Sequence, residues 1–282
     1  MNTIEAMNPL FKKGQAGDSK DFIIFILEQI HTELKYSVEN NIEPKNPLNQ
    51  YDKRNAFDHF FYDFKNEVSI ISDIFFGFNE TTNVCLNCKN NYNSRNLANP
   101  ICYNYGIFNV IIFPLEEVKN MKNRNNFMMN SNNIVDINDC FCYNQKTDYF
   151  TGENKNYCNI CRQLFDSEYT SKIYSSPNVL ILILNRGKNN IYNVKINFKE
   201  EIDISQFVQM KNSTQVYELY GVITHLGESG PNAHFVASCK SPIDNNWYRY
   251  NDAMVNPIFN FMKEIHEFGK PYILFYQKKV NK

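Results

Sequence analysis

The chain has 282 residues, of which 43% are hydrophobic and 15% aromatic, so it can bury the core of one large domain or two small ones. A formal net charge of −1 without a basic stripe argues against a nucleic-acid partner. The sequence contains neither a basic amphipathic helix nor an apolar run of roughly 18 residues, so nothing in it indicates a membrane partner. The first residues lack the pattern of a secretory signal, so we expect an intracellular protein of the cytoplasm or the nucleus.

The first predicted element is an amphipathic helix over residues 18–36. Its apolar stripe recurs at i+4 steps and consists of Phe22, Ile26, Ile30 and Leu34, widened by Ile23 and Leu27. Asp18 is the expected N-cap, because a short carboxylate side chain can accept a hydrogen bond from the first free backbone N–H groups. A polar linker closed by Pro44 and Pro47 follows, and a shorter second helix is predicted over residues 56–65.

From residue 68 onward the sequence is typical of β-structure. Runs of β-branched and aromatic residues predict strands over residues 68–78, 103–113, 179–184, 216–225, 235–239, 247–250 and 272–276. Residues 116–133 are rich in Asn, Lys and Met without a period, and we interpret them as a long exposed loop. Helices first and strands later predict an α+β fold rather than a doubly wound sheet.

Two Cys-x-x-Cys pairs lie 69 residues apart, namely Cys85 with Cys88 and Cys158 with Cys161. This spacing is typical of a tetrahedral zinc site, in which each pair supplies two thiolates from one tight turn. We expect the pairs at the tips of adjacent hairpins, sharing one structural Zn²⁺ with no open position for water. Redox pairs and disulfides are the alternatives, but a chain without a targeting segment favours bound metal in a reducing compartment.

The other four cysteines are expected to have no catalytic role. Cys140 and Cys142 are interpreted as strand residues, mainly of the core, and Cys102 and Cys239 as ordinary buried thiols on or beside strands. A nucleophilic cysteine usually lies at a helix N-terminus, where the dipole lowers the thiol pKa. No cysteine of the chain has such a place.

His234 is the candidate general base. Asn251 and Asp252 follow it by seventeen and eighteen residues, on or after a neighbouring predicted strand. A histidine oriented by a polar side chain is the base half of a Cys–His–Asn or Cys–His–Asp site. The alternative is that Asn251 and Asp252 only form a turn at a strand end. The remaining histidines, His31, His59, His225 and His266, are expected to pack or hydrogen-bond without taking part in chemistry.

Taken in order, these motifs resemble the catalytic domain of the ubiquitin-specific proteases, a papain-like class of deubiquitinases. The segment from Gln15 to Phe22, followed by His31-Thr32-Glu33-Leu34, is similar to the first helix motif of that family. Residues 69–77 resemble the segment before the zinc-binding region, and residues 177–182 resemble the central strand. The four paired cysteines match the family's zinc site, and the His234 and Asn251-Asp252 motifs match its catalytic end.

The resemblance implies a papain-like α+β fold shaped as a right hand. Residues 1–67 would form the remainder of a helical thumb, residues 68–175 the fingers with their zinc knuckles and the adjoining palm strands, and residues 176–282 the palm with the His/Asn end of the catalytic site. It also implies that His234 is the base and Asn251 its orienting residue, assisted by Asp252. Asp18 would bind the ubiquitin tail, whose arginines suit a carboxylate. The implied partners are ubiquitin and ubiquitinated proteins.

The chain departs from the family pattern at the nucleophile. The family's cysteine box should precede the Gln15 motif by several dozen residues, yet none of the 14 residues before it is a cysteine. Three hypotheses follow: a portion of an active deubiquitinase whose nucleophile lies outside this chain, a natural pseudo-deubiquitinase that binds without cleaving, or a zinc-stabilised interaction module unrelated to ubiquitin. By the first hypothesis the chain alone is inactive.

Overall fold

The computed structural model describes residues 2–12, 17–95, 100–125, 134–186, 194–211, 213–227 and 234–280. Gln15, which begins the first helix motif, and residues 126–133 of the predicted loop lie outside these ranges. Within them, the structure has no helix that is both long and apolar enough to cross a membrane.

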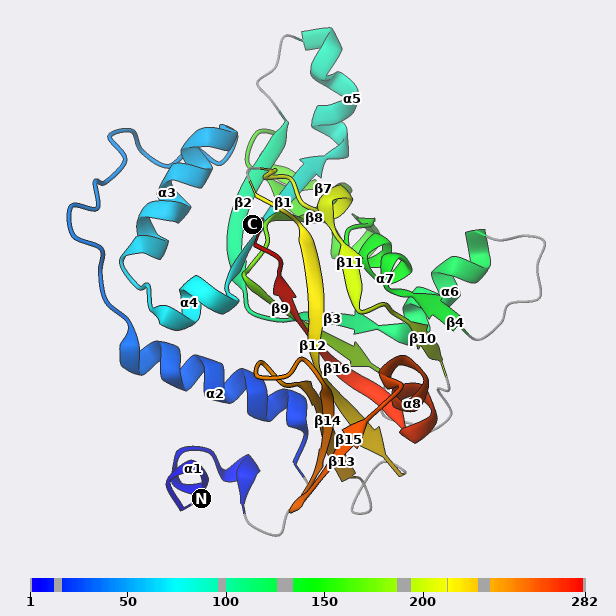
Figure 1. The fold of residues 1–282 in the computed structure, drawn as a ribbon. Coiled ribbons are helices and arrows are strands. Elements are labelled where there is room, and N and C mark those ends of the chain that lie inside the picture. The colour runs from blue at the N-terminus through cyan, green and yellow to red at the C-terminus, as the bar shows by residue number, and fades with distance from the viewer. Residues whose placement is uncertain are drawn as a thin grey trace.

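A mixed eight-stranded sheet forms the largest layer (Figure 1). Its strands run in the order β15-β14-β13-β12-β16-β9-β3, with β11 paired to β12. Among the described strands of this sheet, only β3 and β9 pair in parallel. The bounds are β3 (Ile111–Pro114), β9 (Val179–Asn185), β11 (Glu201–Asp203), β12 (Val216–Leu226), β13 (His234–Lys240), β14 (Trp247–Asn251), β15 (Met254–Ile258) and β16 (Lys270–Lys278).

Helices cover both faces of this sheet. On one face, α2 (Ser19–Leu34) and α4 (Ile70–Phe75) pack through Leu27 and Ile71 against the odd-numbered residues of β9. On the other face, α6 (Leu115–Asn125), α7 (Ile137–Asn144) and α8 (Phe261–Phe268) pack against the even-numbered ones. Strand β9 is therefore buried from Val179 to Leu184, as expected for a central strand covered on both sides.

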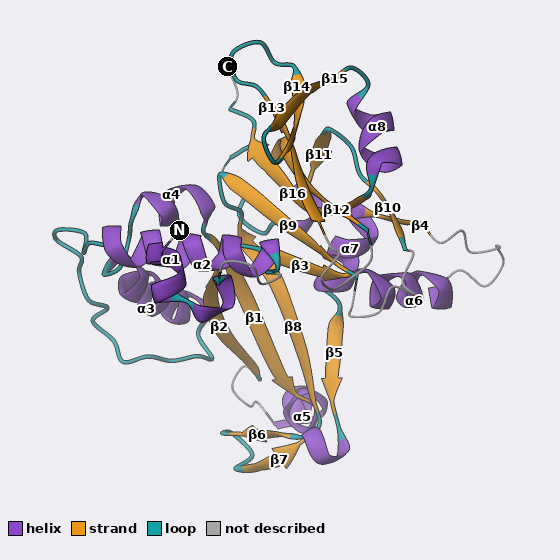
Figure 2. Ribbon diagram, turned by 90° about the horizontal axis from the view of Figure 1, so that it is seen from below, coloured by secondary structure: helices purple, strands orange, loops and turns teal. Residues whose placement is uncertain are grey.

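A second sheet extends away from the first, as Figure 2 shows. Its order is β2-β1-β8-β5, all antiparallel, with β1 (Gly77–Cys85), β2 (Ile101–Phe108), β5 (Thr147–Phe150) and β8 (Ser167–Ser175). At its far end lie α5 (Leu86–Arg95) and the hairpin of β6 (Asn156–Cys158) and β7 (Gln163–Phe165). Helix α3 (Lys53–Lys65) packs on β2, and α1 (Asn2–Met7) precedes a 3-10 turn at Pro9–Phe11.

Helix α2 confirms the predicted N-cap but not the predicted buried stripe. Asp18 accepts a hydrogen bond from the Lys20 backbone N–H at 2.8 Å. Phe22, Ile30 and Leu34 are 40%, 37% and 52% exposed, and of the predicted stripe only Leu27, one of the two residues that widen it, is buried. Apolar residues surround so much of this helix that the sequence period alone did not select its buried face.

Two predicted strands are wrong in part. Residues 70–75 form helix α4 because Ser69 and Ser72 build a reciprocal capping box, which outweighs the β-propensity of the isoleucines. The strand predicted over residues 103–113 is divided: β2 ends at Phe108, and β3 begins at Ile111 in the other sheet. Both stretches are apolar, and only the tertiary structure assigns them to different layers.

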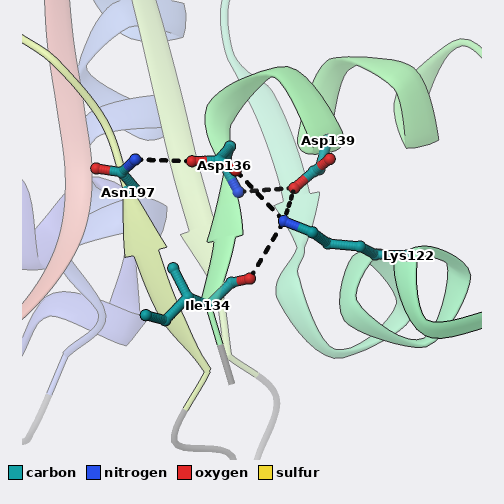
Figure 3. Close-up of polar contacts among 5 residues, drawn as sticks. All are labelled: Lys122, Ile134, Asp136, Asp139 and Asn197. Carbon is teal, nitrogen blue, oxygen red and sulfur yellow. Dashed lines mark hydrogen bonds and ion pairs between the residues drawn. The ribbon is translucent and has the colours of Figure 1, made fainter. Parts of the chain in front are cut away.

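The loop predicted over residues 116–133 is also wrong in its first part, because residues 115–125 form α6. Leu115 and Val118 are fully buried, and Lys122 ties the helix to its neighbours (Figure 3). Its ammonium donates to Asp139 Oδ2 at 2.6 Å and lies 3.3 Å from Asp136 Oδ2, while Asn197 Nδ2 donates to Asp136 Oδ1 at 2.7 Å. This network joins α6 and α7 to the parallel pair β4 (Ile134–Asp136) and β10 (Lys195–Asn197).

The cysteines outside the two pairs need smaller corrections. Cys140 and Cys142 lie on helix α7 rather than on a strand; Cys140 is fully buried, as expected for the core, but Cys142 is exposed. Burial raises the pKa of the Cys140 thiol to about 12. Cys102 and Cys239 lie on β2 and β13 and are only partly buried, because neither face of β2 is fully covered and only one face of β13 is.

Candidate catalytic site and metal centre

His234 and Asn251 meet at one end of the large sheet. His234 is the first residue of β13, and Asn251 is the last residue of β14, the next strand. The His234 Nε2 atom lies 2.7 Å from Asn251 Oδ1. The turn that ends β14 at Asp252, where φ is 50°, leaves Asn251 directly opposite Met254 in the hairpin. Asn251 and Asp252 do lie at a turn, as the alternative interpretation held, but Asn251 also bonds to the histidine.

This hydrogen bond decides which ring nitrogen can act as a base. An amide oxygen only accepts, so Nε2 carries the proton and Nδ1 is left free to take one. The Asp252 carboxylate lies 3.8 Å from Nε2 and its side chain is 82% exposed. At that distance Asp252 is too far away for a hydrogen bond to the ring.

Asp18, just before α2, contacts the large sheet at strand β16. Tyr272 of β16 donates from its hydroxyl to Asp18 Oδ1 and Oδ2, at 2.9 and 2.8 Å. The Tyr272 ring packs on Phe235, with centroids 5.6 Å apart, and Phe235 packs on His225 at 5.2 Å. Phe235 directly follows His234 on β13, so these packed rings place Asp18 near the strand end that carries the histidine.

The other histidines have local contacts. His31 Nδ1 lies 2.7 Å from Ser69 Oγ, His59 Nε2 lies 2.8 Å from the Asn46 carbonyl oxygen, and the His266 ring packs on Phe198. Burial lowers the pKa of His225, and Lys270 lowers it further.

The four paired cysteines form one cluster at the far end of the small sheet. Their Sγ atoms all lie within 4.8 Å of one another. Cys85 ends β1, Cys158 ends β6, and Cys161 lies in the β6–β7 turn. Cys88 lies in the first turn of α5, contrary to the expectation that no cysteine lies at a helix N-terminus, but its thiol belongs to the cluster. The clustering agrees with the prediction, but only the second pair is on a hairpin; the first lies at a strand-to-helix junction.

The donor set of the cluster fits zinc. Cys85, Cys88 and Cys158 are buried, and Asn87 Nδ2 donates to Cys161 Sγ at 3.3 Å. Burial raises the pKa of the Cys88 thiol, so without a cation this sulfur holds its proton. A tetrahedral ion of softness matching thiolate would be held by all four sulfurs and would have no open position.

Within the part of the chain that the structure describes, no hydrogen bond joins His234 to a cysteine. Four of the eight cysteines form the cluster, and Cys140 lies in the core behind the sheet. Tyr272 could not be identified from the sequence, because nothing local connects it with a carboxylate 254 residues away.

The comparisons with known proteins agree on one family. The family model described as "Ubiquitin carboxyl-terminal hydrolase" matches residues 1–276. Ubiquitin carboxyl-terminal hydrolase 17-like protein B of Mus musculus is 24% identical over 280 residues, which cover 98% of this chain and 49% of that protein. Ubiquitin carboxyl-terminal hydrolase 48 of Gallus gallus is 31% identical over 123 residues, 41% of this chain and 12% of that protein.

Solved structures show the same fold. A SAGA DUB module bound to ubiquitin aldehyde superimposes with a TM-score of 0.61 at 19% identity, covering 95% of this chain and 50% of that one. A SAGA DUB module bound to monoubiquitin gives 0.63 at 19% identity, with the same coverage. The chain thus spans about half or less of the length of the relatives it matches.

Proposed function

Because this chain belongs to the ubiquitin carboxyl-terminal hydrolase family and has its papain-like α+β fold, we propose that it carries the base and substrate-binding part of a cysteine-type deubiquitinase. The reaction would be thiol-dependent hydrolysis of the bond after ubiquitin's terminal glycine. Residues 1–67 would correspond to the thumb, residues 68–175 to the fingers and residues 176–282 to the palm.

The observation that carries the proposal is the 2.7 Å hydrogen bond between His234 and Asn251. Asn251 keeps the proton on Nε2, so Nδ1 would take the thiol proton and later return it to the leaving lysine amine. Asp252, 3.8 Å from the ring, would assist the polar chemistry nearby. In this role the side-chain oxygen of Asn251 matters, whereas a residue that only closes a turn would matter through its backbone.

Asp18 would bind the arginine-bearing tail of ubiquitin close to the base. Its side chain is 34% exposed, so the carboxylate can meet a ligand from solvent, and a charge-assisted bond to a guanidinium is stronger than a neutral one. Zinc bound by the four cysteines would hold the end of the small sheet and take no part in the reaction.

The nucleophile would come from outside these 282 residues, because none of the described cysteines is hydrogen-bonded to His234. By itself the chain would then bind ubiquitin without cleaving it. The same observation also supports a second candidate, a natural pseudo-deubiquitinase that holds ubiquitin or another partner.

Titration of isotope-labelled ubiquitin with the zinc-loaded chain tests this function. Chemical-shift changes along the ubiquitin tail and its apolar patch are expected, and their absence with a folded sample would contradict ubiquitin binding. A ubiquitin carrying a C-terminal electrophile tests the nucleophile. No adduct is expected; an adduct mapped by mass spectrometry to one of the eight cysteines would contradict an external thiol.

A further inference from the structure

The surroundings of Asp18 suggest how the proposed tail-binding carboxylate is kept ready. Three groups contact it: the Lys20 backbone N–H at Oδ1, the Tyr272 hydroxyl at both oxygens, and the Lys20 ammonium, which lies 3.3 Å from Oδ2. The N-cap bond ties Oδ1 to α2, and the Tyr272 bond ties the whole group to β16. The carboxylate is thus fixed from two elements before any substrate binds.

Tyr272 is placed for this contact by an irregularity in the sheet. Between β12 and β16, Ile223 pairs with Ile273 and Thr224 pairs with Pro271, so the pairing skips Tyr272. An unpaired residue of this kind points its side chain differently from a regular strand residue, and such bulges are frequent beside active sites. Burial, and after it the Asp18 charge, raises the pKa of Tyr272, so the phenol remains a donor at neutral pH.

Lys20 is the cation that the carboxylate already holds. Its ammonium lies between Asp18 Oδ2 at 3.3 Å and Asp21 Oδ1 at 3.6 Å, with the three side chains 28%, 34% and 50% exposed for Lys20, Asp18 and Asp21. Exposed ion pairs of this kind are weak, and the helix dipole disfavours a cation in the first turn. Lys20 can leave Asp18 at little cost, since Asp21 remains as a partner.

We propose that Asp18 acts as a cation-exchange site, in which Tyr272 fixes the carboxylate and the Lys20 ammonium occupies it until a cationic group of the ubiquitin tail takes its place. The inference rests on the proposed function, because it assigns Asp18 to that tail. Tyr272 is here a positioning residue that acts through Asp18. Lys20 competes with the ubiquitin tail for Asp18 and so lowers the affinity for cationic tails. It also neutralises the carboxylate, so that a neutral tail does not meet an unpaired charge.

The test compares dissociation constants for two probes, ubiquitin and a ubiquitin whose tail arginines are replaced by glutamine. Lys20→Met is expected to tighten binding of ubiquitin about threefold, the size of one exposed ion pair. Tyr272→Phe, which removes one hydroxyl, is expected to weaken it about fivefold. Both effects should disappear with the glutamine-tailed probe, whereas a purely structural role of Tyr272 would weaken both probes alike.

Lys35→Met is the matched control, because Lys35 pairs with the exposed Glu67 just beyond the other end of α2, roughly 24 Å away. It removes the same charge without touching Asp18 and should leave both constants unchanged. Lys20→Met should not lower the melting temperature, and Lys20→Gln should reproduce its effect.

Three results would overturn the inference. The first is that Lys20→Met acts no differently from Lys35→Met, and the second is that Tyr272→Phe weakens both probes equally. The third is that the wild-type chain binds both probes equally, which would leave ubiquitin binding intact and remove only the role of Asp18. If the wild-type chain binds neither probe, the proposed function fails together with the inference.

Discussion

The eight-stranded sheet and the far end of the four-stranded sheet are stabilised in different ways. Strand β9 of the large sheet is buried on both faces, and Leu182, Ile183 and Leu184 have no exposed surface. Strand β2 of the small sheet has no buried residue at all. At the far end of that sheet, the buried cluster of described residues consists of Cys85, Cys88 and Cys158, packed by a few partly buried side chains.

This difference indicates which part of the molecule can fold through apolar packing alone. Each fully buried aliphatic side chain contributes about 1.5–3 kcal/mol, so the large sheet has many independent contributions. The end of the small sheet has too little apolar surface for that, and its order depends on what the four thiols bind. The proposed base lies in the first region and the proposed zinc in the second, so chemistry and metal can be separated experimentally.

Removing the metal should have the largest effect. Structural zinc contributes on the order of 10 kcal/mol in small zinc-binding peptides, so chelation or Cys88→Ser should unfold α5 and the β6–β7 hairpin. Hydrogen exchange should show lost protection there, with β9 and β16 unchanged. Cys142→Ser, at an exposed thiol of α7, is the control. A purified chain that contains no zinc and still protects this end would contradict the metal assignment.

A cavity in the large sheet should have the next largest effect. Leu182→Ala removes a fully buried side chain, and the free energy of unfolding should fall by about 2–5 kcal/mol in denaturant titrations. Ile112→Ala on the adjacent strand β3 is the matched control, because Ile112 is 41% exposed and should lose far less. Similar losses for the two variants would show that the sheet is not packed as described.

Glu80 should be the main polar contribution to the small sheet. Its side chain is 5% exposed and accepts from Lys53 at 2.7 Å, Tyr105 at 2.6 Å and Gln209 at 3.0 Å. Burial alone would raise its pKa, but these three donors lower it below the usual value. Glu80→Gln should cost about 1–3 kcal/mol.

The control for Glu80 is Glu201→Gln, in an exposed pair with Lys279, which should change stability by less than about 0.5 kcal/mol. Because the Glu80 pKa is lowered by folding, the difference between Glu80 and its Gln variant should be present at neutral pH. It should shrink as the pH falls through the folded-state pKa. A difference that is constant down to strong acid would contradict the role of the charge.

The smallest expected effect is a loss of stability in mild acid. Burial lowers the pKa values of His31, His225 and His266, so below about pH 6.5 the unfolded chain binds protons that the folded chain does not. Stability should therefore fall as the pH drops through that value. Trp247, the only tryptophan, stacks on Phe261 of α8 and reports unfolding of the large sheet. His266→Phe should reduce the slope, and an unchanged slope would contradict its share.

Much of the candidate site followed from short segments of sequence. The two Cys-x-x-Cys pairs, the N-cap at Asp18 and the strands that carry His234 and Asn251 all depend on neighbours within a few residues. The misread elements were those in which local signals disagreed. The Ser69–Ser72 capping box overrode a β-rich composition, and residues 115–125 became helix α6 through two buried side chains and the Lys122 network.

The family, the α+β class, the cysteine pairs and the candidate base could be inferred from the sequence alone, because each depends on residue types at fixed local spacing. Three contacts could be seen only in the fold: Asn251 Oδ1 lies beside Nε2 of His234, Leu27 rather than Phe22 is buried, and the Tyr272 hydroxyl binds Asp18. These contacts were not predictable because their residues lie far apart along the sequence. Contacts between residues tens to hundreds of positions apart depend on strand order, register and a bulge, and no local pattern encodes these.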